Sequence, residues 1–295
     1  MNINYLLEAI LHKMHYEELP DALFLKIKYF VKTGRFLHLR NPKTFTEKLQ
    51  WLKLYNRKPE YTSMVDKIAV KEYVASRIGK EYIIPTICVW SSIKDIDFKQ
   101  LPEKFVLKTN NGGGSNGVVI CRDKRNLNIE ETIKQLEKSL KSDIYKNYRE
   151  WPYKNVLPRI FAEQLLEMPN DIDLPDYKFF CFNGKPRYCQ VISNRRYRMS
   201  IDFFDKDWNH QVFREPKEYP FATTCPRKPK HYDEMWHLAE TLACGTPFVR
   251  IDFYDTGDKV YFGEITFFPT SGMQIFVPRH WDRVFGELIL LPSSK

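Results

Sequence analysis

The spacing of apolar positions changes once along the chain, near residue 80. Before that point apolar residues recur at intervals of three and four, as in ALFLKIKYFVKTGRF, which is the period of an amphipathic helix. Thr44 and Glu47 have the spacing of a capping box in front of KLQWLKLY. Another helix is predicted from about residue 63 to residue 77, ending at Gly79, where a left-handed residue is expected. The first 60 residues, including INYLLEAILHKM, are therefore predicted to form a helical region packed on the main body.

After residue 80 the chain consists mainly of short β-rich segments. They are YIIPTICVW, KFVLKT, GVVICR, NVLPRIFAEQLL, DYKFFCFNGKPRYCQVI, SIDFFDKDWNHQVF and PFVRIDFYDTGDKVYFGEITFF. The pair Asn183 and Gly184 is typical of a tight hairpin turn. Only NIEETIKQLEKSL and HYDEMWHLAETLAC have a helical pattern in this part of the chain. The order predicts an α+β fold with mostly antiparallel sheets, not the regular alternation of a doubly wound fold.

The composition is that of a globular protein, with 295 residues of which 43% are hydrophobic. No segment reaches the roughly 18 apolar residues of a membrane span, and the N-terminus lacks the pattern of a signal peptide. We therefore expect a cytoplasmic protein, and peripheral association with a membrane stays open. The formal net charge of +9 fits several anionic partners. No basic run of five or more residues occurs, so charge alone does not choose between nucleic acid, a membrane surface and an anionic substrate. No nucleic-acid partner is predicted.

A glycine-rich segment follows the predicted strand KFVLK, which ends at Lys108. Its residues are Gly112, Gly113, Gly114, Ser115, Asn116 and Gly117. Exposed backbone N–H groups in such a loop can surround phosphate oxygens, and the lysine adds a positive charge. Walker and Rossmann loops open a helix, whereas this loop leads into another β-rich segment. It is predicted to be a hairpin lid over phosphates; a glycine-rich turn without function is the alternative.

Two polar positions at the start of DYKFFCF share one face of the predicted strand. Alternation places Asp176 and Lys178 together, so an acidic group for ribose hydroxyls and a cation for phosphate would be neighbours. A solvated ion pair at a sheet edge is the alternative. Residues 163–166 close an earlier β-rich segment, and their backbone could meet an adenine edge. Taken alone, that segment is more typical of a core strand.

The last predicted hairpin carries a pattern suited to a metal ion. Arg250 and Asp252 share one face of its first strand, and Glu264 and Thr266 share one face of its second strand. A turn at residues 255–258 would bring the two carboxylates to one hard cation, for which magnesium with added phosphate ligands is suitable. Arg250 could stabilise charge on a phosphoryl group or oxyanion. A salt-bridged strand pair is the alternative.

Taken in order, these segments resemble the ATP-grasp superfamily, in particular its TupA-like branch, which is associated with teichuronopeptide and cell-surface polysaccharide biosynthesis. The resemblance runs from about residue 41 to residue 277 and is carried by NPKTFTEKLQWLKLY, MVDKIAVKEYV, FVLKTNNGGGSNG, DYKFFCFNGKP, FVRIDFY and FGEITFFPTSG. It implies two α+β subdomains with mostly antiparallel sheets that sandwich ATP. They would comprise residues 61–160, with the lid, and residues 161–295, with the metal site, after a helical region at residues 1–60.

The resemblance also implies roles for individual residues. The residues that would bind the nucleotide are Lys67, Lys71, Lys108, the lid from Gly112 to Gly117, Glu163, Gln164, Leu165, Leu166, Asp176 and Lys178. Lys178 and Arg250 would act in catalysis, and Asp252 and Glu264 would hold Mg²⁺. Thr266 stands where superfamily members usually have asparagine, which weakens its assignment as a third metal ligand.

The activity that the resemblance implies is ATP-dependent ligation of a carboxylate to an amine. ATP would phosphorylate the carboxylate, and the amine would attack the acyl phosphate to give an amide, ADP and phosphate. The branch suggests an amino acid and a sugar acid of a surface polysaccharide, or its precursor, as the small-molecule substrates. Two alternatives stay open: a sugar or polysaccharide kinase on the same scaffold, and a nucleotide-binding partner of a glycosyltransferase.

Overall fold

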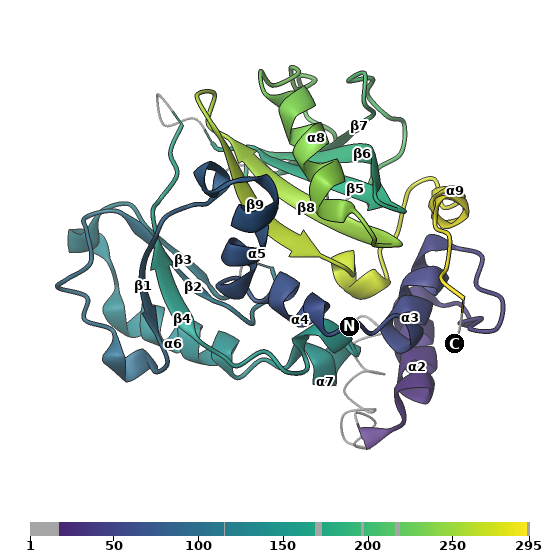
Figure 1. Ribbon diagram of the computed structural model, residues 1–295, viewed down its shortest axis with the longest axis horizontal. Helices are drawn as coiled ribbons and strands as arrows, with labels where there is room; N and C mark the ends of the chain where they lie inside the picture. The colour runs from purple at the N-terminus through teal and green to yellow at the C-terminus, as the bar shows by residue number, and fades with distance from the viewer. Residues whose placement is uncertain (1–17, 115, 169–172, 196–197, 216–218, 294–295) are drawn as a thin grey trace.

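The computed structural model describes residues 18–114, 116–168, 173–195, 198–215 and 219–293. The predicted helix INYLLEAILHKM and the lid residue Ser115 lie outside the described residues. Two antiparallel sheets form the body, with α4 and α5 between them and α2, α3 and α9 at one side (Figure 1). The predicted α+β fold is therefore confirmed. Within the described residues, none of the helices combines the length and the apolar character needed to span a membrane.

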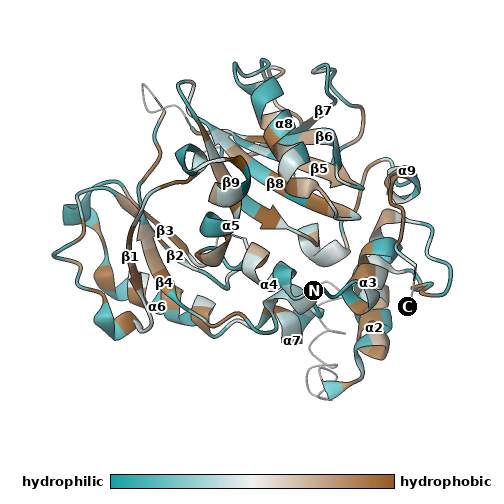
Figure 2. Ribbon diagram, in the orientation of Figure 1, coloured by the Kyte–Doolittle hydropathy of each residue, from teal (hydrophilic) through white to brown (hydrophobic). Residues whose placement is uncertain are grey.

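Helices dominate the described chain up to residue 78. Helix α2 (Asp21–Thr33) ends at Gly34, whose φ of 70° is left-handed. Helix α3 (Phe45–Tyr55) begins with the predicted capping box: Thr44 accepts from the Glu47 N–H, and the Glu47 side chain accepts from the Thr44 N–H. Both helices are amphipathic in the hydropathy colouring of Figure 2.

The single helix predicted at residues 63–77 is wrong, because two helices occupy this part of the chain. They are α4 (Glu60–Val65) and α5 (Ala69–Ile78). The Asp66 carboxylate accepts from the N–H groups of Ile68 and Ala69, at 2.8 and 3.2 Å, and so caps the start of α5. Gly79 has the positive φ of 113° that favours glycine, but its ψ of 154° differs from the left-handed helical conformation that was predicted.

The first sheet has the strand order β1-β4-β2-β3. Its strands are β1 (Thr86–Trp90), β2 (Phe105–Thr109), β3 (Val118–Cys121) and β4 (Ile160–Glu163). Helix α6 (Ile129–Leu140) covers one face through Leu136, which packs with Phe105 and Leu107. Helix α7 (Ile144–Tyr148) follows it. The domain boundary predicted between residues 160 and 161 falls at the start of β4, whose hydrogen bonds belong to this sheet.

The second sheet has the strand order β7-β6-β5-β8-β9. Its strands are β5 (Asp176–Phe182), β6 (Lys185–Ser193), β7 (Ser200–Phe204), β8 (Phe248–Asp255) and β9 (Val260–Thr266). Asn183 and Gly184, with φ 49° and 78°, form the predicted hairpin turn between β5 and β6. The short 3-10 helices are Lys80–Tyr82, Ile93–Asp95, Lys124–Asn126, Trp151–Tyr153 and Pro269–Gly272.

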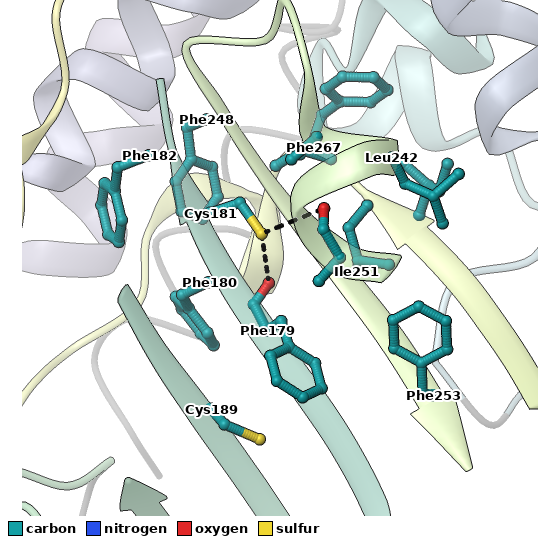
Figure 3. Packing of buried hydrophobic residues seen from close by; sticks show 14 of the residues in the cluster. Phe179, Phe180, Cys181, Phe182, Cys189, Leu242, Phe248, Ile251, Phe253 and Phe267 are labelled. Carbon is teal, nitrogen blue, oxygen red and sulfur yellow. Dashed lines mark hydrogen bonds between the residues drawn. The ribbon is translucent and has the colours of Figure 1, made fainter. Parts of the chain in front are cut away.

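The two faces of the second sheet are covered by different helices. Figure 3 shows Phe179 and Cys181 on one side of β5, where Cys181 Sγ donates to the carbonyl oxygens of Phe179 and Ala239. Ala239 belongs to α8 (Tyr232–Ala243), which therefore covers that side. On the other side Phe182 packs edge-on against Phe285 of α9 (Trp281–Leu288), with ring centroids 5.5 Å apart. The remainder of this second face carries the charged residues described next.

Candidate nucleotide and metal site

Three of the predicted nucleotide-binding side chains meet on the first sheet. Glu163 ends β4, and its carboxylate accepts from Lys71 Nζ at 2.9 Å and forms an ion pair with Lys108 of β2. Lys71 also lies over the ring of Phe161, 5.2 Å from its centroid. Burial raises the pKa of Glu163, but the two lysines outweigh burial and lower it. The carboxylate therefore stays ionised and holds both ammonium groups on the face opposite α6.

Lys67 connects the glycine-rich loop to the helices between the sheets. It lies in the break between α4 and α5, and its Nζ donates to the carbonyl oxygen of Gly112. Burial lowers the pKa of Lys67, Glu264 raises it and Lys108 lowers it. Since these charges belong to different sheets, Lys67 lies where the two walls of the site approach each other.

The glycine-rich loop joins β2 to β3, which pair as the predicted antiparallel hairpin. Its glycines are required for two different reasons. A Cβ on Gly112 would lie 2.7 Å from Thr109 Oγ1 and 2.9 Å from Ser139 Oγ, two hydroxyls that are hydrogen-bonded to each other. Gly114 instead has φ 64°, a left-handed conformation that other residues rarely adopt. Close packing therefore requires glycine at position 112, and the backbone conformation requires it at position 114.

The segment predicted as the adenine hinge follows β4 towards the second sheet. The Gln164 N–H donates to the carbonyl oxygen of Pro85 at 3.0 Å, while its side chain is exposed. Leu165 and Leu166 are partly exposed. The Glu163 carboxylate is occupied by lysines, so it is not available to an adenine edge.

On the second sheet, cross-strand pairing brings the predicted metal and phosphate residues together. Lys178 of β5 lies opposite Asp252 of β8, and Asp252 lies opposite Glu264 of β9. Lys178 forms ion pairs with Asp252 and, at 2.9 Å, with Asp176. The predicted turn at residues 255–258 is one residue too early, because β8 continues to Asp255 and β9 begins at Val260. A bulge between Asp252 and Phe253 restores the alignment of the two carboxylates.

Arg250 contacts both predicted metal-binding carboxylates. Its Nε and Nη2 donate to the two oxygens of Asp252, each at 2.7 Å, and Nη2 also donates to Glu264 at 2.9 Å. Burial lowers the pKa of Arg250, but Asp252 and Glu264 outweigh burial and raise it. Burial raises the pKa of Glu264, whereas Lys67, Lys178 and Arg250 lower it to about 2. Glu264 is therefore an anion at neutral pH.

The donor set fits a magnesium ion held mainly by substrate and water. Asp252 and Glu264 supply carboxylate oxygens from neighbouring strands on one face. No group of three His, Cys, Asp or Glu side chains among the described residues is arranged as a metal site. Magnesium is commonly held by one or two carboxylates together with substrate phosphates and water, so two are enough. Thr266 donates to Glu264 Oε1 at 3.3 Å and accepts from Arg250, which orients the carboxylate.

The sequence did not identify every polar residue that the fold brings to this face. Arg195, in the connection after β6, forms an ion pair with Asp176 at 2.5 Å. Tyr153 is close enough to Arg250 and Glu264 for their charges to affect its pKa, which burial raises. Neither residue is part of a recognisable motif, so only the fold reveals that they adjoin the site.

Comparison with known proteins identifies the family. The family model described as TupA-like ATPgrasp matches residues 47–290, and the chain belongs to this family. The predicted TupA-like family and ATP-grasp fold are thereby confirmed. No curated protein matches the chain.

Solved structures of ligases are similar to the chain at low identity. D-alanine–D-alanine ligase from Bacillus anthracis is 19% identical, with 76% of this chain and 64% of that chain covered and a TM-score of 0.44. The same ligase complexed with ATP is 18% identical, with 69% and 53% covered and a TM-score of 0.36. The ATP-grasp ligase PsnB complexed with a minimal precursor, Mg and ADP is 11% identical, with 75% and 57% covered and a TM-score of 0.37. The chain thus spans less than two thirds of the length of these ligases.

Proposed function

We propose that the protein is an ADP-forming carboxylate–amine ligase that acts in the cytoplasm. Its substrates would be an amino acid and a sugar acid of a cell-surface polysaccharide or its precursor. The observation that carries the proposal is that lysines and an arginine lie beside buried carboxylates on both sheets. Lys108 pairs with Glu163 on the first sheet, and Lys178 and Arg250 pair with Asp252 on the second. Lys67 is affected by the charges of Lys108 on one wall and Glu264 on the other. A magnesium-bound triphosphate, which needs cations around its phosphates and carboxylates at its metal, matches this arrangement.

In this proposal the nucleotide lies between the sheets. Lys108 binds phosphate oxygens from the first sheet and Lys178 from the second, while Lys71 stays beside Glu163. The backbone after Glu163 meets the adenine, and Asp176 meets the ribose. The hairpin lid between β2 and β3 covers the phosphates and excludes water, which would otherwise hydrolyse a reactive acyl phosphate.

The second sheet carries the chemical step. Asp252 and Glu264 would hold Mg²⁺, which when bound neutralises charge that develops on the transferred phosphoryl group. A carboxylate oxygen of the sugar acid attacks the γ-phosphorus of ATP, and ADP leaves. Arg250 is held in place by Asp252 at 2.7 Å and faces the charge that develops on the acyl group. An amine then attacks the acyl carbon, and phosphate leaves as the amide forms.

Product analysis tests this proposal. The protein is supplied with Mg-ATP and pairs of uronic acids and amino acids, and the nucleotide product is identified. ADP and phosphate that require both substrates, together with hydroxylamine trapping of the acyl phosphate as a hydroxamate, are expected. AMP and pyrophosphate would contradict the acyl-phosphate route. A phosphorylated sugar made without any amine would indicate the kinase, and ATP binding without turnover would indicate the glycosyltransferase partner.

A further inference from the structure

A second polar cluster adjoins the site on the β6 side of Lys178. Gln190 lies opposite Lys178 in the β5–β6 ladder, so both side chains are on one face of the sheet. The Gln190 side-chain amide donates to Glu215 Oε1, and Gln274 Nε2 donates to the same oxygen at 2.6 Å. Gln190 and Gln274 are buried, with 2% and 4% of their surface exposed, whereas Glu215 is partly exposed. We call Gln190, Glu215 and Gln274 the Glu215 cluster.

The backbone around Glu215 is fixed by the fold. Its neighbour Arg214 exchanges two backbone hydrogen bonds with Val277, at 3.0 and 2.8 Å. Phe213, the residue before Arg214, is completely buried and packs against Phe203 and Phe285. The carboxylate is therefore positioned by three separate segments: β6, the connection before α8 and the chain after β9. Such support is what a group needs if it is to meet a substrate in a defined geometry.

Glu215 differs from the other carboxylates of the site in its partners. Asp176, Asp252, Glu163 and Glu264 each form an ion pair with a lysine or arginine. Within the described ranges, Glu215 forms none, and its Oε2 has no hydrogen-bond donor. Burial raises its pKa, and hydrogen bonding by Gln190 and the charges of Arg250 and Lys178 only partly offset that effect. Gln190 and Gln274 thus hold one oxygen and no donor holds the other, in a carboxylate close enough to Arg250 and Lys178 for their charges to act on it.

Amide formation from an amino acid can be accelerated by a group of this kind. An amino acid is an ammonium ion at neutral pH, so it needs a negative partner beside the cations that bind the phosphates. It also cannot attack a carbonyl carbon until a proton has been removed from its nitrogen. A carboxylate with one fixed oxygen and one open oxygen can do both.

We propose that Glu215 receives the ammonium group of the amine substrate and acts as its general base; this inference rests on the proposed ligase function. One N–H proton passes to Glu215 Oε2, and the nitrogen lone pair forms the C–N bond with the acyl carbon. The C–O bond to phosphate breaks, and its electron pair leaves with the phosphate. The second proton that the nitrogen must lose passes to solvent. Gln190 and Gln274 are positioning residues that hold Glu215 Oε1.

A binding experiment tests the ammonium site without any turnover. The Mg-ADP-loaded protein is titrated calorimetrically with each common amino acid and with its N-acetyl derivative, which has no ammonium group. We expect the parent protein to bind at least one free amino acid and not its N-acetyl form. Glu215→Gln should weaken that binding about tenfold or more, the effect of losing a charged hydrogen bond. The control Glu240→Gln, at a partly exposed residue that loses an ion pair with Lys185, should bind normally.

Three results would overturn the ammonium site. They are a parent protein that binds none of the amino acids, equal binding of a free amino acid and its N-acetyl derivative, and unchanged binding by Glu215→Gln. Each can be read whether or not the protein makes an amide.

A second experiment tests the base. D-glucuronate and Mg-ATP are supplied with either an amino acid or hydroxylamine, which is largely unprotonated at neutral pH and needs no base. We expect Glu215→Gln to form hydroxamate at the parent rate while amide formation falls by about 10² to 10⁴-fold, the usual contribution of a general base. Gln274→Ala removes a donor to the carboxylate, so the acid limb of its kcat/KM profile should move to higher pH.

Failure of the base role and failure of the ligase function give different results in these experiments. Normal amide formation by Glu215→Gln would overturn the base role alone. A parent protein that forms no hydroxamate with D-glucuronate or with any other uronic acid of the product analysis would overturn the ligase function and the base role with it, while the binding experiment still decides the ammonium site.

Discussion

One face of the second sheet has an aromatic end and a charged end, and both are built by the same strands. Phe180 and Arg250 mark the border, because they lie directly opposite each other on β5 and β8. Towards one end Phe182 faces Phe248, and towards the other Lys178 faces Asp252. Strand alternation therefore places all these side chains on one face without separating packing from chemistry.

What separates the two ends is the structure that covers them. Helices α3 and α9 cover the aromatic end, where Phe45 and Phe285 have ring centroids 5.7 Å apart. At the charged end the side chains pair with each other, as Arg250 does with Asp252 and Glu264. Residues at the aromatic end should consequently determine stability, and residues at the charged end should determine turnover.

The largest expected effect is on turnover at the charged end. Glu264→Gln keeps the shape of the side chain but removes an anionic oxygen, so ATP should still bind while Mg²⁺-dependent turnover falls by about a thousandfold or more. Asp252→Asn should act in the same direction. Steady-state ADP release measures the effect, with Glu240→Gln as a control on the surface of α8. Full activity in Glu264→Gln would remove the metal site from the proposal.

A substitution at the aromatic end should instead lower stability and leave ATP binding unchanged. Phe285 is fully buried and contacts Phe45, Phe182 and Phe276, so Phe285→Ala should lower the free energy of unfolding by about 3 to 5 kcal/mol. The ATP affinity of the folded protein should not change. Urea unfolding and calorimetry measure the two quantities, and Phe36→Ala, at a side chain 75% exposed, is the matched control. Loss of ATP affinity without loss of stability would contradict the division of the face.

A buried lysine outside both ends provides a test by pH. Lys53 is completely buried and donates to the carbonyl oxygens of Tyr148 and Ser271, both at 2.8 Å. Lys53→Met removes the ammonium group from those two oxygens and from the nearby Glu150. We therefore expect the free energy of unfolding to fall by about 3 kcal/mol. Burial lowers the pKa of Lys53 from 10.5 to about 8, although Glu150 raises it.

The sign of the pH dependence follows from proton counts. Between pH 8 and 10.5 the unfolded parent chain holds the Lys53 proton more often than the folded chain does, so this residue makes stability rise with pH. The variant lacks that rise. The difference in free energy of unfolding between the parent and the variant should therefore widen from pH 8 to pH 10.5. Urea unfolding at pH 7, 8.5 and 9.5 measures it; a constant deficit would mean that Lys53 does not titrate there.

Much of the fold could be predicted because its signals are local. The capping box at Thr44 and the turn at Asn183 and Gly184 involve residues close in sequence, and both predictions are confirmed. The break between α4 and α5 was missed because Asp66 and Lys67 are compatible with a helix by spacing. Only the hydrogen bonds that the Asp66 side chain accepts in the folded chain reveal its capping role.

Two bulges, which the sequence does not show, determine which side chains of the site lie opposite each other on neighbouring strands. Phe253 lies opposite Phe262, so without a bulge Asp252 would face Gly263 and Glu264 would lie on the other side of the sheet. The expectation that Asp252 and Glu264 meet is realised only through this bulge. A second bulge at Phe180 brings Gln190 opposite Lys178, where direct counting from the turn would place Cys189. The Glu215 cluster was therefore not predictable from alternation.

The smallest expected effect is on ATP affinity. It distinguishes the contribution of Lys108 on the first sheet from that of Lys178 on the second. Lys108→Ala and Lys178→Ala should each weaken ATP binding by about 1 to 3 kcal/mol, the scale of a lost charged hydrogen bond. Lys108 is the cleaner test, because Lys71 remains bound to Glu163 and keeps that carboxylate paired. Lys178→Ala instead leaves Asp252 with Arg250 alone, so part of its effect should appear as lost stability.

Calorimetric titration with Mg-ATP measures both variants. The control is Lys104→Ala, which removes an exposed ion pair with Glu167 directly before the start of β2. Because the two lysines act from different sheets, the double variant should lose at least as much ATP affinity as either single variant. Unchanged affinity in Lys108→Ala with weakened binding in Lys178→Ala would confine the phosphates to the second sheet. Unchanged affinity in both would remove the phosphate assignment from either wall.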